Sequence, residues 1–304
     1  MPLNIFIGST GLGGITKLPP ASAPIMKDSN AILAMREALL AQPRQTAWVV
    51  VTGPCTNAAL LFATFPEVVD HIVGLSIMGG AVGGGFTEAK NGKTDGGLEK
   101  DANERFGNET DWAEFNIFCI FQHYIYCDRV LTIKGDPEAA RSIFSNPALA
   151  AKTTLITLDL THLCFATSAV REKLLNGGDS GKPPSDLRVM LEEILAFFAS
   201  GYDNFFGMAD GPPLHDPLAV AALLPNSKIF QDEGDRYIVT MVTAGEHTVV
   251  DGVDLEGARG QVGRTIVTPT KNGKGIRIPR KLDVDAFWQT LSDCCTVAER
   301  KDVL

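Results

Sequence analysis

The sequence predicts an α/β fold with a mainly parallel (mixed) open sheet that is covered by helices. Apolar β-branched runs alternate with amphipathic helical stretches, which is the pattern of parallel strands connected by helices. The chain has 304 residues, of which 45% are hydrophobic and 21% charged, so it can bury one large core. No internal repeat or domain boundary stands out, and we expect a single domain over residues 1–304.

The first elements are a helix, a buried strand and a second helix. Residues 30–41 have the apolar spacing of a helix, and the apolar run at residues 46–52 predicts a strand that is buried on both faces. A glycine-proline turn follows. Either Thr56 or Asn57 is expected to cap the next helix, over residues 58–65.

The later elements continue the alternation. Residues 72–78 predict the second strand. Helical patterns occur at residues 136–144, 185–198 and 216–224. The last part, residues 237–281, is rich in valine, threonine and glycine and predicts strands joined by turns.

Three short segments are expected at the carboxyl edge of the sheet, where open α/β sheets bind their ligands. Thr52 leads into the glycine-proline turn after the first strand, and Met78 precedes two glycines after the second strand. Residues 158–162 occupy the corresponding place farther along the chain. These loops therefore form the candidate site.

Two further segments hold the polar groups of a sugar site. The first, residues 107–116, contains amide and carboxylate side chains that can bracket vicinal hydroxyl groups. These side chains belong to Asn108, Glu114 and Asn116. The second, residues 211–219, places His215, a proton carrier, beside Asp216, a hard oxygen ligand.

Taken with the turn at Thr52 and the glycines after Met78, these segments closely resemble the inosine/uridine-preferring nucleoside hydrolases, in particular the fungal uridine nucleosidase type. The resemblance covers nearly the whole chain from Gly8 onward and implies the nucleoside-hydrolase-like fold. It also implies hydrolysis of the N-glycosidic bond of ribonucleosides of the uridine/inosine class, giving ribose and free base. The cofactor that it implies is one Ca²⁺ ion, whose bound water is the nucleophile.

The resemblance also assigns roles to individual residues. The metal ligands would be the carboxylate of Asp216 and the main-chain carbonyl of Thr52. His215 would protonate the leaving base, because imidazole is a competent acid near neutral pH. The residues that hold the ribose hydroxyls or lie in the same pocket would be Met78, Asn108, Glu114, Phe115 and Asn116. Phe115 could face either the base or the core.

Several of these residues also have a structural interpretation. Asp216 could cap a helix whose first position is a proline, and this role is compatible with metal binding. We interpret His162 as a structural histidine. Tyr202 and Phe206 are candidates for stacking on the base, but aromatic residues four apart on a helix more often belong to a core.

Two features depart from the family pattern. Relatives begin with a strand that carries an aspartate cluster, which is absent before Gly8, so we expect an N-terminally truncated domain. Thr52 and Asp216 alone fall short of the roughly six to eight oxygens that calcium prefers, which predicts an incomplete metal site. The alternative is a catalytically impaired paralogue that binds nucleoside or ribose without turnover. The second departure is at residues 120–135, which predict an insertion or a retained intron.

Composition limits the partners. The formal charge of −9 argues against a nucleic-acid partner, and no stretch is apolar enough to span a membrane or to act as a signal peptide. The six cysteines form no CxxC pair, which favours reduced thiols and a cytoplasmic location.

The glycines between Gly8 and Gly14 could cradle phosphate in an unrelated enzyme, but they match neither a P-loop nor a dinucleotide fingerprint. We expect a small-molecule nucleoside as the substrate and a homodimer or homotetramer as the assembly.

Overall fold

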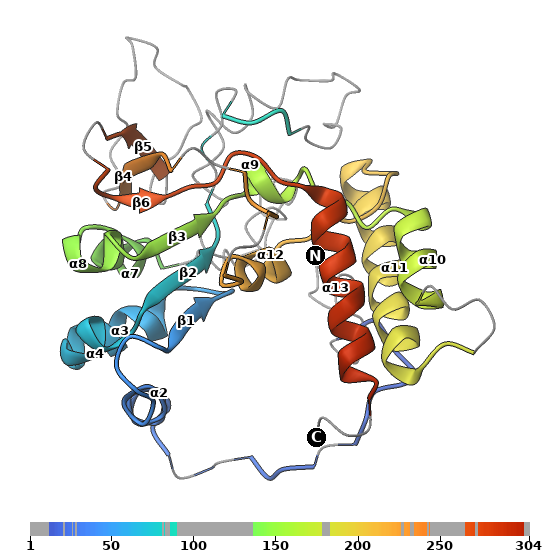
Figure 1. Cartoon of the computed structure of the whole chain (residues 1–304), viewed down its shortest axis with the longest axis horizontal. Helices are drawn as coiled ribbons and strands as arrows, with labels where there is room; N and C mark the ends of the chain where they lie inside the picture. The colour runs from blue at the N-terminus through green and yellow to red at the C-terminus, as the bar shows by residue number, and fades with distance from the viewer. Residues whose placement is uncertain are drawn as a thin grey trace, which may run out of the picture.

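The protein is an open sheet with helices on both faces (Figure 1). The computed structural model describes residues 12–20, 22–25, 27, 29–80, 82, 86–89, 136–177, 183–225, 228–231, 234–241, 243, 265–270 and 273–300. Within these residues lies a six-stranded sheet with the order β1-β2-β3-β6-β4-β5. The strands are β1 (Trp48–Val51), β2 (Gly74–Met78), β3 (Thr153–Ile156), β4 (Arg236–Met241), β5 (Thr265–Pro269) and β6 (Ile276–Arg277).

The strand directions confirm the predicted mainly parallel, mixed sheet. β1, β2, β3 and β6 are parallel to one another, each pairing with the next in this order. β4 is antiparallel to both β6 and β5, so the sheet ends in an antiparallel ribbon. All residues of β2 and β3 are buried, as expected for strands that have helices on both faces.

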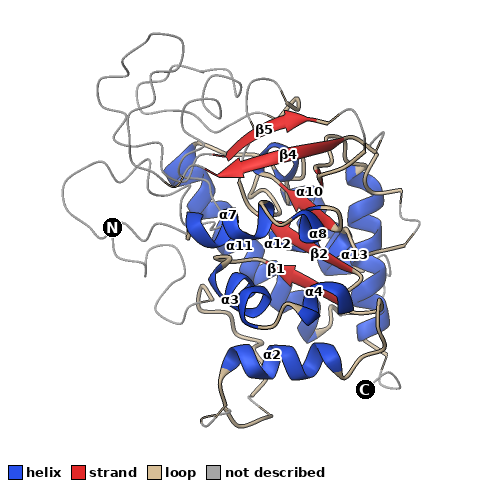
Figure 2. Cartoon of the chain, turned by 90° about the vertical axis from the view of Figure 1, so that its left-hand side faces the viewer, coloured by secondary structure: helices blue, strands red, loops and turns tan. Residues whose placement is uncertain are grey.

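Two layers of helices cover the sheet. One face packs against α3 (Thr56–Thr64), α4 (Glu67–His71), α7 (Pro137–Phe144) and α8 (Pro147–Ala150), with α2 (Ala31–Leu40) against α3 and α4 (Figure 2). The other face packs against α9 (Leu158–Thr161), α12 (Asp216–Ala221) and α13 (Val284–Ala298). The remaining helices, α10 (Ser168–Asn176) and α11 (Asp186–Phe206), lie beside α13 (Figure 1). In the described part of the chain, none of the helices combines the length and apolar character that crossing a bilayer requires.

Helix ends show where local patterns succeed and fail. α2 begins one residue after the predicted start, because Asn30 caps it: the Asn30 side chain accepts hydrogen bonds from the main-chain N–H groups of Ile32 and Leu33, at 2.9 and 3.3 Å. The predicted cap of α3 is wrong. Thr56 is the first residue of this helix, and its hydroxyl donates to Asp136 Oδ2 at 2.7 Å instead of capping the helix. The tertiary contact therefore overrides the local preference.

α11 is longer and α12 shorter than their apolar patterns predict. α11 continues to Phe206 and ends at Gly207, whose φ of +63° is the left-handed conformation typical of a helix C-terminus. α12 ends at Ala221. The greater length of α11 places Tyr202 inside the helix and close to the sheet edge.

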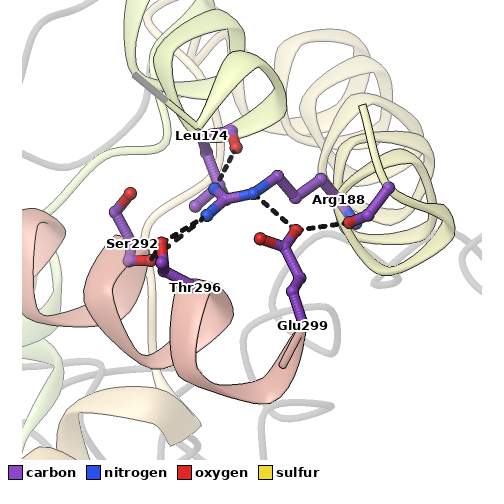
Figure 3. Close-up of polar contacts among 6 residues, drawn as sticks. Leu174, Arg188, Ser292, Thr296 and Glu299 are labelled. Atoms are coloured by element: carbon purple, nitrogen blue, oxygen red, sulfur yellow. Dashed lines mark hydrogen bonds and ion pairs between the residues drawn. The ribbon is translucent and has the colours of Figure 1, made fainter. Parts of the chain in front are cut away.

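A buried arginine joins the ends of three helices on the α10–α11–α13 side of the molecule (Figure 3). Arg188 in α11 is 3% exposed and donates through Nη1 to the carbonyl of Leu174 in α10, at 2.6 Å. Its other donors reach α13 and the residue after it: Thr296 Oγ1 at 2.9 Å, the Ser292 carbonyl at 3.3 Å and Glu299 Oε1 at 2.7 Å. Ser185, which caps α11, also donates to Glu299 Oε1. One guanidinium group thus connects α10, α11 and α13.

Gly74 leaves room for a tryptophan on the neighbouring strand. A Cβ atom at this position would lie 2.1 Å from the ring of Trp48, its cross-strand partner. We therefore expect Gly74→Ala to lower the free energy of unfolding by about 1–3 kcal/mol, measured by urea denaturation. The matched control is Gly201→Ala in α11, where a Cβ would meet nothing within 4 Å and where alanine should raise stability by about 0.5–1 kcal/mol. Equal effects of the two substitutions would contradict this steric explanation.

Candidate active site

The carboxyl ends of three parallel strands build the floor of the candidate site. β1, β2 and β3 are adjacent and parallel, so the residues that follow them meet at one edge of the sheet. Thr52 follows β1 and is exposed, whereas Met78 ends β2 and is 2% exposed. α12 is fixed against these strands by the Ser76 hydroxyl, which donates to the Ala219 carbonyl at 2.7 Å.

Main-chain hydrogen bonds connect the turn after β2 to the turn after β3. The Gly79 N–H donates to the Ile156 carbonyl at 3.0 Å, and the Leu158 N–H donates to the Gly80 carbonyl at 2.9 Å. Gly80 has φ of +70°, which favours glycine at this position. The double-glycine signal after Met78 therefore has a physical explanation, since the chain must turn sharply here while remaining bonded to β3 and α9.

The segment before α12 runs beside the segment after α9. Leu214 donates to the Cys164 carbonyl at 2.8 Å, and Ala166 donates to the Pro212 carbonyl at 2.9 Å. Gly211 has φ of +127°, and a Cβ atom there would lie 2.4 Å from the Ala166 carbonyl oxygen. This close approach brings His215, at the start of α12, over the C-terminal end of α9.

His215 is buried and hydrogen-bonded on both sides of its ring. His215 is 6% exposed. Nδ1 lies 2.8 Å from Thr161 Oγ1, and Nε2 lies 3.0 Å from the hydroxyl oxygen of Tyr202. The ring of His162 is 5.6 Å away, centroid to centroid. Four side chains from α9, α11 and α12 thus form one polar cluster.

Burial controls the protonation of this cluster. Burial and the neighbouring His162 hold the pKa of His215 well below its usual value of 6.5. Burial also lowers the pKa of His162 to about 4. Burial, and then the Asp216 carboxylate, raise the pKa of the Tyr202 phenol, which keeps its proton. The cluster is therefore electrically neutral near pH 7.

Asp216 has an open carboxylate oxygen. Its Oδ1 is buried and has no hydrogen-bond partner among the described residues. Burial raises the pKa of this carboxyl from 3.8 to about 6. The predicted N-cap role of Asp216 is wrong: His215 occupies the cap position, and Asp216 lies in the first turn of α12. An unsatisfied buried oxygen in this position fits a cation ligand.

The described residues do not complete a calcium site. Within the described ranges, no group of three or more His, Cys, Asp or Glu side chains is arranged to hold a metal ion. Asp216 offers one oxygen, and Thr52 could add its main-chain carbonyl from the same edge of the sheet. These two residues fit the ion, but they supply fewer than the roughly six to eight oxygens that calcium usually takes.

The structure brings together part of the predicted residue set. Thr52 and Met78 lie at the carboxyl ends of adjacent parallel strands, and His215, which precedes Asp216, is hydrogen-bonded to Thr161 after β3. Met78 packs with the apolar cluster that includes Leu214. The other predicted sugar-binding residues lie outside the described residues: Asn108, Glu114, Phe115 and Asn116. Any role of these four in binding stays a prediction.

Sequence reasoning missed two partners of His215. Tyr202 was expected as a core residue or as a surface for base stacking, and Thr161 was not singled out. The sequence feature that could have indicated Thr161 is its position within residues 158–162, one of the three segments expected at the sheet edge. His162 is buried, as a structural histidine would be, although its ring also faces His215.

Comparison with known proteins places these features in a family. The family model of the inosine-uridine preferring nucleoside hydrolases matches residues 2–119 and 132–289. The chain belongs to this enzyme family. The match reaches residue 2, so the resemblance extends farther toward the N-terminus than the predicted beginning at Gly8. Residues 120–131 fall between the two matched ranges.

Relatives of this nucleoside hydrolase come from distant organisms. The chain is 28% identical to the uridine nucleosidase of Saccharomyces cerevisiae, over 98% of this chain and 74% of the relative. It is also 28% identical to a probable ribonucleoside hydrolase of Dictyostelium discoideum, over 93% of this chain and 69% of the relative. A purine-preferring ribonucleoside hydrolase from Gardnerella vaginalis has the same fold, with a TM-score of 0.62 at 21% identity over 97% of this chain and 74% of that structure.

Proposed function

We propose that this nucleoside hydrolase cleaves the N-glycosidic bond of ribonucleosides of the uridine/inosine class to give ribose and the free base. The observation that supports this most is the convergence of His215 and Asp216 with the loops after β1, β2 and β3. Members of the family act on nucleosides, and the segments that hold His215, Asp216 and the loops after β1 and β2 are among those that resemble the family. A proton donor beside an open carboxylate oxygen suits a reaction in which the leaving base must be protonated while an oxygen nucleophile attacks the sugar.

In this proposal His215 protonates the leaving base. The imidazole lies at the N-terminus of α12, next to Asp216, and is oriented by hydroxyl groups on both sides. Because it is neutral near pH 7, it must take up a proton from solvent before it can transfer one to the base. Because Nε2 faces the Tyr202 hydroxyl, a bound base would have to take the place of this hydroxyl or lie against it. Tyr202 therefore contributes to the base side of the site.

Calcium binding would involve Asp216 through its open oxygen Oδ1 and Thr52 through its main-chain carbonyl. When bound, the ion would supply a coordinated water as the nucleophile. The chain's contribution is a half-buried carboxylate, with Oδ1 buried, on a short helix that is fixed to β2 by the bond between Ser76 and Ala219. We further propose that Asn108, Glu114 and Asn116 hold the ribose hydroxyls, that Met78 lines the sugar pocket and that Phe115 lies near the base.

The internal segment at residues 120–135 is proposed to be an insertion relative to the family. The interruption of the family match at residues 120–131 supports this proposal. Sequencing of the transcript across this region separates a genuine insertion from a retained intron, since a spliced transcript would lack the corresponding codons.

A second candidate function is the binding of nucleoside or ribose without turnover. The observation that favours it is that the described residues contain no group of three or more metal-ligating side chains. A pocket with an incomplete metal site would keep the hydrogen-bonding groups for the sugar but lack an activated water. This alternative predicts affinity for nucleoside that does not depend on calcium.

The deciding experiment measures ribose release from uridine and from inosine by a reducing-sugar assay. The protein is assayed in phosphate-free buffer with calcium, with a chelator and with added phosphate. The proposed function predicts release that requires calcium and is independent of phosphate. Nucleoside binding by calorimetry without any ribose release would overturn the proposal and support the binding function. Release only in the presence of phosphate would instead indicate phosphorolysis.

A further inference from the structure

The two hydroxyl groups that flank His215 are not equivalent. Thr161 is the last residue of α9, and Tyr202 lies in α11, so the imidazole is held between two elements that are fixed independently of α12. Thr161 is fully buried and Tyr202 is 4% exposed, so bulk water does not compete for either hydroxyl. The direction of each hydrogen bond then depends on what else each hydroxyl can bond.

The Thr161 hydroxyl has a second neighbour that can only accept. Its Oγ1 lies 3.4 Å from the Leu158 carbonyl oxygen, three residues back in the same helix. A carbonyl oxygen has no proton to give, so the hydroxyl proton of Thr161 points toward Leu158. The lone pairs of Oγ1 remain for His215 Nδ1 at 2.8 Å, and this bond therefore requires a proton on Nδ1.

The bond on the opposite side of the ring agrees with this direction. The group on this side of the ring is the Tyr202 hydroxyl, and a phenol has one proton to donate. It can therefore donate to Nε2, at 3.0 Å. A neutral imidazole has one donor nitrogen and one acceptor nitrogen, and the two hydroxyls satisfy both when the proton is on Nδ1. In the opposite tautomer, Nδ1 would have to accept from the Thr161 hydroxyl, which would give up its contact with Leu158. The proton on Nε2 would then face the Tyr202 hydroxyl, which would have to turn its own proton away from the ring.

We propose that Thr161 is a positioning residue that keeps the proton of His215 on Nδ1. Nε2 is then the nitrogen that faces the base side: it takes up one proton from solvent to form the imidazolium and transfers that proton to the leaving base, which returns His215 to its neutral Nδ1–H form. This inference rests on the proposed function for its catalytic meaning, but the tautomer itself is a property of the unliganded protein. Thr161 has the role that a carboxylate has in a catalytic triad, where it orients the histidine, but Thr161 does this with a hydroxyl group.

The test is nitrogen NMR of the histidine side chains. The chain has five histidines, so ¹⁵N-histidine labelling gives a small set of signals, and His215→Gln identifies those of His215. Long-range proton–nitrogen correlations distinguish a protonated Nδ1 from a protonated Nε2. We expect Nδ1–H in the unmodified protein and in Thr161→Ser, which keeps the hydroxyl. Thr161→Val keeps the shape but removes the acceptor, and should shift the tautomer toward Nε2–H.

The matched control is Thr153→Val. Thr153 is also a buried threonine whose hydroxyl donates to a carbonyl of its own segment, Leu149 at 2.7 Å, but it lies at the opposite end of β3. This control should leave the His215 signals unchanged, and urea denaturation shows that each variant is folded. If ribose release is observed, Thr161→Val should lower kcat at least ~10-fold with KM nearly constant, and Thr161→Ser should restore most of it.

Two results would overturn the inference. One is a protonated Nε2 on His215 in the unmodified protein, and the other is an identical His215 tautomer in the unmodified protein and in Thr161→Val. Absence of ribose release from the unmodified protein would instead contradict the proposed hydrolysis, and the NMR result would still decide the role of Thr161.

Discussion

Replacing Asp216 with asparagine is expected to abolish calcium-dependent ribose release and, at the same time, to stabilise the protein in the presence of a chelator. The first effect follows because Oδ1 is the open, buried carboxylate oxygen at the candidate site and an amide is a much weaker calcium ligand. The second follows because burial disfavours the charged carboxylate in the absence of a cation. Both effects come from one oxygen atom, so they should appear in the same variant.

The stabilising effect should depend on pH in a defined direction. The pKa of Asp216 is raised from 3.8 to about 6 in the folded protein, so the stability that its protonated form supports is present below pH 4 and lost as the pH rises through 6. Asparagine does not titrate. With a chelator present, we therefore expect Asp216→Asn to raise the free energy of unfolding by about 1–2 kcal/mol at pH 7, allowing for partial exposure, and to have little effect at pH 4.

The matched control is Asp285→Asn, which alters an exposed aspartate in the first turn of α13. It should change neither ribose release nor the pH dependence of unfolding. The measurements are ribose release with and without calcium, and urea denaturation at pH 4 and pH 7. Calcium-dependent release that survives in Asp216→Asn would remove Asp216 from the metal site.

The second large effect is expected at Arg188. Arg188→Met should lower the free energy of unfolding by about 2–4 kcal/mol, because the buried Leu174 carbonyl loses its donor and Glu299 loses its ion-pair partner. The Ser292 carbonyl keeps its hydrogen bond from Thr296 Oγ1, and Glu299 keeps the one from Ser185. Methionine keeps most of the aliphatic volume, so the loss comes mainly from the hydrogen bonds. Arg188→Lys should recover only part of it, since an ammonium group cannot reproduce the guanidinium fork.

This substitution should affect stability without affecting catalysis. Arg188 and Tyr202 are about 21 Å apart along α11, at a rise of about 1.5 Å per residue. Well below the unfolding temperature, kcat should therefore stay within about twofold of the unmodified value, given this separation. The control is Arg36→Leu, at an exposed pair with Glu67, where about 0–1 kcal/mol is expected. A loss of stability at Arg188 no larger than at Arg36 would show that the buried network contributes little.

The sheet and the location of the site could be predicted from the sequence because they depend on local patterns. Apolar runs predict buried strands, and glycine or proline after a run marks its end, so Thr52 and Met78 could be assigned to one edge. The role of Thr56 could not be predicted, because its hydroxyl bonds Asp136, 80 residues away, and does not cap the helix. No local pattern contains that partner.

The polar surroundings of His215 were unpredictable for the same reason. Thr161 is 54 residues away in sequence, and Tyr202 reaches the ring only because α11 continues past the predicted end at residue 198. The position of Asp216 within α12, and not at its cap, depends on how Gly211 packs against Ala166. The residue types indicated the chemistry of the site, whereas the tertiary contacts decide which hydroxyl group faces each ring nitrogen of His215.

The bond from Ser76 to Ala219 has a consequence for the order of folding. The two residues are 143 positions apart, so β2 emerges from the ribosome long before the helix that completes its carboxyl edge. β1, α3, α4 and β2 can associate early, because their contacts are close in sequence. His215 and Asp216 reach the sheet only after translation has passed α12. The candidate site therefore forms later than the association of β1, α3, α4 and β2, and the carboxyl end of β2 stays uncovered until α12 has been made.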